Sequence, residues 1–271
     1  MLLLLFAALF CCYFLRSGHC SPTLLRNQDV LVKAMEYIKE NPETLAGLMD
    51  DEVAEGDMLL LSDRNAVDRR WPSIKIPYLI DYTLEYRRAD IETALKMISL
   101  QTCLSFYQRS HEPDYIFFKS GFGCASYVGF VGGKQEVHVD TTCQVGNIVH
   151  EVLHALGFYH EHTRKDRYKY ITIVHSNIME GHQKNFRMQM GKTFDLPYDI
   201  PSIMHYGSNF FSANGQPTIV AKVKNNRMGQ RVAMTPIDVQ RVRLLYQCDR
   251  ADGIEEPQGW KPVATPGHFS H

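Results

Sequence analysis

The sequence predicts a globular fold of mixed strands and helices, preceded by an apolar leader and an acidic segment. The chain has 271 residues, 45% of them hydrophobic, which is enough to bury the core of one large domain or two modest ones. Lys and Arg number 29 and Asp and Glu 30, so the formal net charge is -1. These values exclude an intrinsically disordered chain and a strongly basic nucleic-acid-binding protein. Composition alone does not indicate a function.

The leader is an unbroken apolar run over residues 2–15 that ends in small and polar residues. A membrane-spanning helix needs about 20 apolar residues, so we interpret residues 1–20 as a secretory signal peptide. The alternative is an N-terminal membrane anchor. Cleavage between Gly18 and Ser21 would remove Cys11 and Cys12, and also Cys20 if the cut follows it. The remaining cysteines form an even set of four, whose three possible pairings the sequence alone does not resolve: Cys103, Cys124, Cys143 and Cys248.

Residues 21–64 are polar and acidic, and we interpret them as a pro-segment or linker. Residues 28–39 can form a short amphipathic helix that Asn41-Pro42 would stop. The rest of the segment has too little apolar pattern for a core of its own. Three arginines at its end, Arg64, Arg69 and Arg70, are candidate sites for a processing protease.

The globular part begins with a strand over residues 74–80, in which apolar and other residues alternate. Pro77 places this strand near a sheet edge or at a strand start. A helix follows over residues 89–100, and short strands are expected at 115–118, 127–131 and 136–139. Thr235-Pro236 is typical of a helix N-cap followed by the first helical residue, and Cys248 closes this last helix. Residues 249–271 are expected to be a flexible tail.

Residues 150–160 contain the candidate metal ligands and the candidate catalytic base. His150 and His154 are four positions apart, so on a helix they lie one turn apart on one face, where both imidazoles can bind one cation. Glu151 lies beside that face, where it can take a proton from a metal-bound water. Gly157 can end the helix and turn the chain, so that His160 reaches the same metal. Three neutral nitrogens plus a water form the open, catalytic type of zinc site, with one Zn²⁺ per chain.

A second motif follows at residues 202–206, with Met204 and Tyr206 in it. A Met after the extended histidine motif is typical of the metzincins, in which the turn containing it lies under the metal. Alone, Met204 would be read as a core residue and Tyr206 as a packed aromatic.

Together these motifs closely resemble the astacin family of zinc endopeptidases. The resemblance extends from about Asn65 to Cys248 and is greatest to the fish hatching-enzyme branch, although the cysteines that this branch usually adds near the mature N-terminus are absent here. It implies an α+β fold of two lobes, with a twisted mixed sheet and two long helices above the cleft and an irregular lower lobe. The matching residues are His150, Glu151, His154, Gly157, Phe158, His160, Glu161, Arg164, Asp166 and Arg167, then Ser202, Ile203, Met204, His205 and Tyr206.

The resemblance also implies roles for individual residues. Tyr206 would be a fifth zinc ligand that swings away to stabilise the oxyanion, and Glu161 would hold the mature N-terminus through water. From spacing alone, Glu161 could equally be an exposed acid. The implied disulfides are Cys103–Cys248 and Cys124–Cys143. The first closes almost the whole domain and would contribute about 4 to 5 kcal/mol on the entropic model.

Activation and specificity follow from the same resemblance. Ala54-Glu55-Gly56-Asp57 keeps the Gly and Asp of the family's pro-segment motif, so Asp57 would occupy the zinc in the zymogen; the alternative is a solvated acidic linker. Cleavage after Arg64 would start the mature enzyme at Asn65, with Trp71 as the alternative start. An extended substrate would pair with an edge strand near residues 124–127. Arg231 would favour an acidic side chain after the scissile bond, the alternative being an ordinary exposed Arg.

The sequence therefore predicts a secreted zinc endopeptidase that is made as a zymogen and cleaves egg-envelope or other extracellular proteins. The alternative is a secreted binding protein that kept the fold but not the activity. We expect a monomer that is activated by another protease, has no nucleic-acid or membrane partner, and is stored in secretory granules before release. No CUB-like or EGF-like module is expected after Cys248.

Overall fold

A computed structural model describes residues 32, 35–39, 41–49, 53–59, 70–224 and 227–249. The proposed signal peptide, the Arg64–Asn65 bond and nearly all of the C-terminal tail lie outside the described residues. Within the described ranges, no helix has the length and apolar character needed to cross a membrane.

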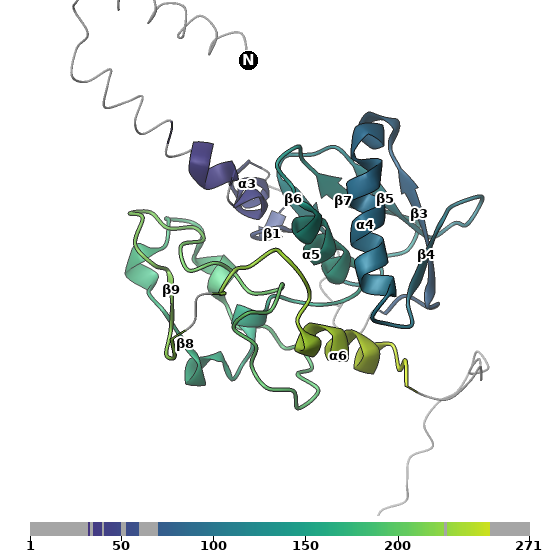
Figure 1. The fold of residues 1–271 in the computed structure, drawn as a ribbon. Coiled ribbons are helices and arrows are strands. Elements are labelled where there is room, and N and C mark those ends of the chain that lie inside the picture. Colours follow the sequence, from purple (N-terminus) through teal and green to yellow (C-terminus); the bar gives the residue numbers. More distant parts are fainter. Residues whose placement is uncertain are drawn as a thin grey trace, which may run out of the picture.

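The larger lobe is a seven-stranded sheet covered by two helices (Figure 1). The strands lie in the order β1-β2-β6-β7-β5-β3-β4, and both parallel and antiparallel pairs occur. The helices are α4 (Arg88–Ser99) and α5 (Val145–Ala155). The strands are β1 (Val53–Glu55), β2 (Met58–Leu59), β3 (Lys75–Ile80), β4 (Ser105–Gln108), β5 (Tyr115–Lys119), β6 (Cys124–Ser126) and β7 (Lys134–Val139).

Apolar periodicity accounts for both helices. In α4 the predicted apolar face, Ile91, Leu95 and Ile98, is buried against the sheet. Helix α5 is buried nearly all round, because it lies between α4 and the second lobe. Burial on every side makes α5 a rigid support for the side chains that it carries.

Two strand predictions need correction. Strand β3 is flanked by β4 and β5 and is not an edge strand, although β5 pairs with it only from Tyr78 onward. Pro77 is thus tolerated because it faces a paired neighbour on one side only, at Tyr107. The strand predicted at 127–131 lies instead at Cys124–Ser126; residues 127–131 form bends and loop, with Gly129 at φ +76°.

The second lobe contains little regular structure. A two-stranded sheet of β8 (Ile171–Ile173) and β9 (Ile219–Ala221) packs with short 3₁₀ helices around a separate apolar cluster that includes Phe186, Tyr206 and Phe211. These 3₁₀ helices are η2 (Glu161–Thr163), η3 (Arg167–Lys169), η4 (His175–Asn177) and η5 (Gln183–Phe186); η1 (Tyr82–Arg87) precedes α4 in the first lobe. Two clusters of buried side chains confirm the two-lobed α+β fold.

Helix α6 (Pro236–Leu245) completes the domain as predicted. Thr235 is its N-cap and accepts a hydrogen bond from the backbone N–H of Asp238. A disulfide joins Cys103 to Cys248 just beyond α6, and a second joins Cys124 of β6 to Cys143 just before α5. The second disulfide therefore ties β6 to the start of α5.

The acidic segment before the domain is more structured than the sequence predicted. Residues 41–49 and 53–59 contain α3 (Pro42–Met49) and the β1–β2 hairpin. Strand β2 pairs in parallel with β6, and α3 lies beside β6 near the boundary of the two lobes (Figure 1). Gly123 allows this contact, because a Cβ there would lie 2.4 Å from the carbonyl oxygen of Pro42. The described helical residues 35–39 end before Asn41-Pro42, as predicted, and a second helix, α3, begins at Pro42.

Candidate active site

Three imidazoles converge on one point at the boundary of the lobes. His150 and His154 project from the same face of α5, and His160 comes from the chain beyond Gly157, which has φ +110°. Their Nε2 atoms are 3.0 Å apart for His150 and His154, 3.1 Å for His154 and His160, and 3.3 Å for His150 and His160. All three side chains are buried.

The hydrogen bonds of the Nδ1 atoms determine whether the converging Nε2 atoms carry lone pairs. Nδ1 of His150 lies 2.7 Å from the carbonyl oxygen of Ile203, and Nδ1 of His154 lies 2.7 Å from that of Phe158. A carbonyl only accepts, so both Nδ1 atoms donate and both Nε2 atoms are left with lone pairs. Burial lowers the pKa of His160 to about 3, so its imidazole is neutral as well. Converging lone pairs repel one another unless a cation lies among them, and three neutral nitrogens suit zinc.

The carboxylate of Asp57 lies where the three imidazoles converge. Its Oδ1 is 2.9 Å from Nε2 of His160, its Oδ2 is 3.2 Å from Nε2 of His150, and its side chain is fully buried. Burial alone would raise the pKa of Asp57, but its contacts with His160, His150 and His154 hold this pKa well below its usual range. The four side chains therefore offer three nitrogens and one anionic oxygen to a single cation.

Gly56 fits the turn before Asp57 for two reasons. Its φ is +64°, and a Cβ at this position would lie 1.8 Å from the hydroxyl oxygen of Tyr206. The Gly-Asp pair thus contacts both the histidine cluster and the tyrosine that the sequence singled out.

Glu151 is fully buried next to this cluster. Among the described residues, neither of its carboxylate oxygens has a hydrogen-bond partner. Burial, together with the nearby negative charge of Asp57, raises the pKa of Glu151 well above its usual value. A buried carboxylate beside a cation-binding cluster is suited to accept and release a proton.

The turn at 202–206 is held from below by α6. Oγ of Ser202 donates to Oδ1 of Asp238 at 2.5 Å, and the backbone N–H of Ile203 donates to Oδ2 at 3.0 Å. Because the carbonyl of Ile203 accepts from His150, this ties α6 to the three imidazoles. Met204 is buried, and its carbonyl oxygen accepts from the backbone N–H of Glu161 at 2.9 Å. The ring of Tyr206 lies 4.4 Å from that of His160.

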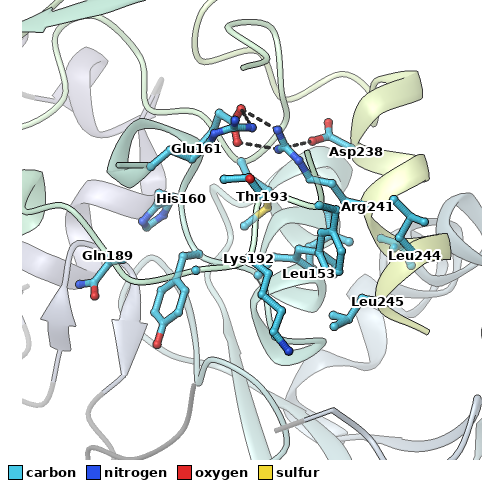
Figure 2. Close-up of a pocket in the computed structure, with 18 of the residues that line it drawn as sticks. Leu153, His160, Glu161, Gln189, Lys192, Thr193, Asp238, Arg241, Leu244 and Leu245 are labelled. Atoms are coloured by element: carbon cyan, nitrogen blue, oxygen red, sulfur yellow. Dashed lines mark hydrogen bonds and ion pairs between the residues drawn. The ribbon is translucent and has the colours of Figure 1, made fainter. Parts of the chain in front are cut away.

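Glu161 is buried and not the exposed acid that spacing alone allowed. It binds Arg241 through two contacts of 2.6 and 2.7 Å and accepts from the backbone N–H of Asp199 at 2.8 Å. Figure 2 shows Arg241 between the carboxylates of Glu161 and Asp238. These side chains line a cavity of about 410 Å³, which Arg70 also lines.

Arg231 does not extend into solvent either. Its guanidinium forms a double contact with the carboxylate of Glu43 on α3, with Nε–Oε1 at 2.6 Å and Nη2–Oε2 at 2.7 Å. Sequence reasoning did not identify Glu43, Asn147, Asp238 or Arg241 as part of the site. Only Asp238 carried a local signal, as the third residue after the Thr235 cap.

Comparison with known proteins agrees with this geometry. The family model described as astacin, a peptidase family, matches residues 63–247. The chain is 41% identical over 222 residues to zinc metalloproteinase nas-4 of Caenorhabditis elegans, covering 74% of this chain and 70% of that protein. It is 37% identical over 215 residues to the low choriolytic enzyme of Oryzias latipes, covering 73% and 79%.

A solved structure is similar too. High choriolytic enzyme 1 of Oryzias latipes, a hatching enzyme zinc-protease, superposes with a TM-score of 0.64 at 35% identity and covers 69% of this chain and 98% of that one. Other relatives are longer. The chain spans only 45% of zinc metalloproteinase nas-14 of Caenorhabditis elegans and 41% of blastula protease 10 of Paracentrotus lividus.

Proposed function

The chain belongs to the astacin family of peptidases, and from this premise we propose that it is a secreted zinc endopeptidase made as an inactive precursor. The observation that carries the proposal is the convergence of three neutral imidazoles beside the buried, unpartnered carboxylate of Glu151. His150, His154 and His160 would hold the zinc. When bound, zinc would polarise the scissile carbonyl and make water more acidic.

The chain's own residues would supply the remaining chemistry. Glu151 would accept a proton from the attacking water and pass it to the leaving nitrogen of the peptide. Its burial supports this role, because a desolvated carboxylate holds a proton more readily than an exposed one. The hydroxyl of Tyr206 would donate a hydrogen bond to the oxyanion as the tetrahedral intermediate forms. Met204 and the turn around it would support the ring of imidazoles from below.

In the precursor, residues 21–64 would block this site as a pro-segment. Asp57 would bind the metal together with the three imidazoles, at the ligand position that the attacking water would otherwise take. Strand β2 pairs with β6, which is the strand where an extended substrate would add by main-chain hydrogen bonds. The pro-segment would therefore exclude both the attacking water and the substrate backbone.

Cleavage after Arg64 would start the mature enzyme at Asn65. The indole N–H of Trp71 donates to the carbonyl of Ala155 at 3.0 Å and its ring is buried, so a start at Trp71 would leave no free chain to move. Residues 65–69, by contrast, can span up to about 17 Å from the edge of the cavity that contains Glu161. N-terminal sequencing of the processed protein distinguishes the two starts.

The proposed substrates are egg-envelope or other extracellular proteins. Two relatives support this class, since one is named a choriolytic enzyme and the other a hatching enzyme. We also propose that the enzyme acts as a monomer after cleavage by a separate activating protease.

Removing the metal tests the proposed function. Treating the processed protein with a chelator is expected to abolish casein cleavage, because the three imidazoles then hold no cation to polarise the carbonyl. Adding one equivalent of Zn²⁺ should restore the activity. Casein cleavage that persists in metal-free protein, or a processed protein that is inactive with zinc bound, would contradict the proposal; the second result would favour a binding protein.

The substrate preference of Arg231 gives a second test. Once Glu43 has left with the pro-segment, the guanidinium would bind an acidic side chain just after the scissile bond. In a peptide series, Arg231→Gln is expected to lower kcat/KM about tenfold or more for peptides with Asp or Glu at that position, and to change neutral peptides little. Arg243→Gln, on the outer face of α6, serves as the control. A wild-type enzyme without acidic preference would contradict this role.

A further inference from the structure

We propose that Glu43 is a second anchor of the pro-segment, bound by Arg231 and Asn147 and independent of the metal. The inference rests on the proposed function in one respect, that residues 21–64 are an inhibitory segment. Asp57 would block the metal, whereas Glu43 would hold the segment in place whether or not a metal is bound.

The site around Glu43 is built to bind a carboxylate. Only 2% of Glu43 is exposed, although it lies in the first turn of α3 on the surface of the mature domain. The guanidinium of Arg231 donates to both carboxylate oxygens of Glu43, and Nδ2 of Asn147 donates to Oε1 at 2.7 Å. A buried carboxylate is stable only when it is paired in this way.

The orientation of the Asn147 amide is fixed by its helix. Oδ1 of Asn147 accepts from the backbone N–H of Gln144 at 2.8 Å, in the capping box that opens α5. With its oxygen held there, the amide must direct its NH₂ group toward Glu43. The same residue thus caps the metal-binding helix and supplies a donor to the pro-segment.

Arg231 is also positioned by the mature domain. Its Nη1 donates to the carbonyl of His205 at 3.0 Å and to that of Gln230 at 3.1 Å. Gly146 allows the loop to lie directly on α5, because a Cβ at residue 146 would lie 1.7 Å from the carbonyl oxygen of Arg231. The cationic site therefore depends on mature-domain contacts, and only its occupant comes from the pro-segment.

The two carboxylates lie on packed but separate elements. Glu43 is on α3 and Asp57 follows the β1–β2 turn; the two elements meet where a Cβ on Gly47 would lie 2.4 Å from the carbonyl oxygen of Gly56. Holding α3 in place therefore holds the Gly56–Asp57 turn against the imidazoles. An anchored turn rebinds its site as an intramolecular ligand at high effective concentration.

Hydrogen exchange of the full-length chain tests the anchor, with and without a chelator. Glu43→Gln is expected to increase exchange of the α3 and β2 amides by at least about 30-fold in both conditions, because Arg231 is left buried without its counter-charge. Glu36→Gln, an exposed acid in the same segment, should change exchange less than about threefold. Unchanged exchange in α4 and β5 would show that the domain itself is intact.

A paired substitution separates recognition of charge from packing. Asn147→Asp keeps the capping oxygen but places a second carboxylate against Glu43, so α3 should open as in Glu43→Gln. In the double variant Glu43→Gln/Asn147→Asp the pair again consists of one carboxylate and one amide, joined by a hydrogen bond of reversed direction, and at least about tenfold of the lost protection should return. Equal exchange in Glu43→Gln and Glu36→Gln, or no recovery in the double variant, would overturn the proposal. Because exchange needs no activity, this result is independent of the casein test.

Discussion

Replacing Glu151 with Gln in the processed enzyme is expected to lower kcat/KM for a peptide substrate by about 10³-fold or more. General-base catalysis contributes about 10² to 10⁴ in rate, and the buried amide that replaces the carboxylate cannot accept the proton. Gln has nearly the same size as Glu, so the imidazoles should keep their positions. Steady-state kinetics with a fluorogenic peptide measures the loss.

Metal content is the control that assigns this loss to proton transfer. Glu151→Gln should still bind about one zinc per chain by elemental analysis, because Glu151 is not one of the three imidazole donors. Glu180→Gln, an exposed acid in the second lobe, should retain wild-type kinetics. A Glu151→Gln enzyme that keeps more than about a tenth of the wild-type rate would remove Glu151 as the base.

Replacing Asp57 with Ala is expected to convert the latent precursor into one that cleaves peptide before processing. The substitution removes the anionic oxygen that lies 2.9 Å from Nε2 of His160, so water could take the ligand position on the metal that Asp57 would hold. If the wild-type precursor is open about one time in a hundred, and the loss of this ligand raises the open fraction to about one in ten while the contacts of α3 and β2 remain, its activity rises about tenfold. The measurement is peptide cleavage by purified full-length chain.

Processing must be prevented for this comparison to be clear. Adding Arg64→Ala to both wild type and Asp57→Ala removes the proposed cleavage site, and intact mass confirms that the chain stays whole. Glu36→Ala removes an acid from the same segment without touching the site and should remain latent. Latency that is unchanged in Asp57→Ala would show that strand pairing and α3 alone block the cleft.

The elements with local signals were predicted well. Helices α4 and α6 follow from apolar spacing and from the Thr235 cap, and the convergence of three imidazoles follows from the spacing of His150, His154 and His160. The fold class came from the resemblance that these motifs carry. The strand expected at 127–131 was wrong because aromatic and apolar residues there pack in a loop that its glycines allow.

The structure of residues 41–49 and 53–59 could not be predicted from local patterns, because their partners are distant in the sequence. In the sequence, nothing distinguishes Glu43 from the other acids of the segment. Its partner, Arg231, lies 188 residues later. The contact of Asp57 with imidazoles about 100 residues away was expected only through the family resemblance, and the acidic composition of the segment gave no sign of it. Charge density alone therefore suggested a solvated linker, whereas two of its acids are among the most buried charged residues in the described part of the chain.

The Cys124–Cys143 disulfide bears on how the cleft can open. It joins the strand that pairs with the pro-segment to the residues that lead into α5, which carries Asn147 and the first two imidazoles. Strand and helix therefore cannot move apart, and this wall of the cleft does not widen to release its occupant. In the proposed function, activation would then require the departure of residues 21–64 and no movement of β6 away from α5. Because the segment would leave only after the chain is cut, activation of each molecule would be irreversible.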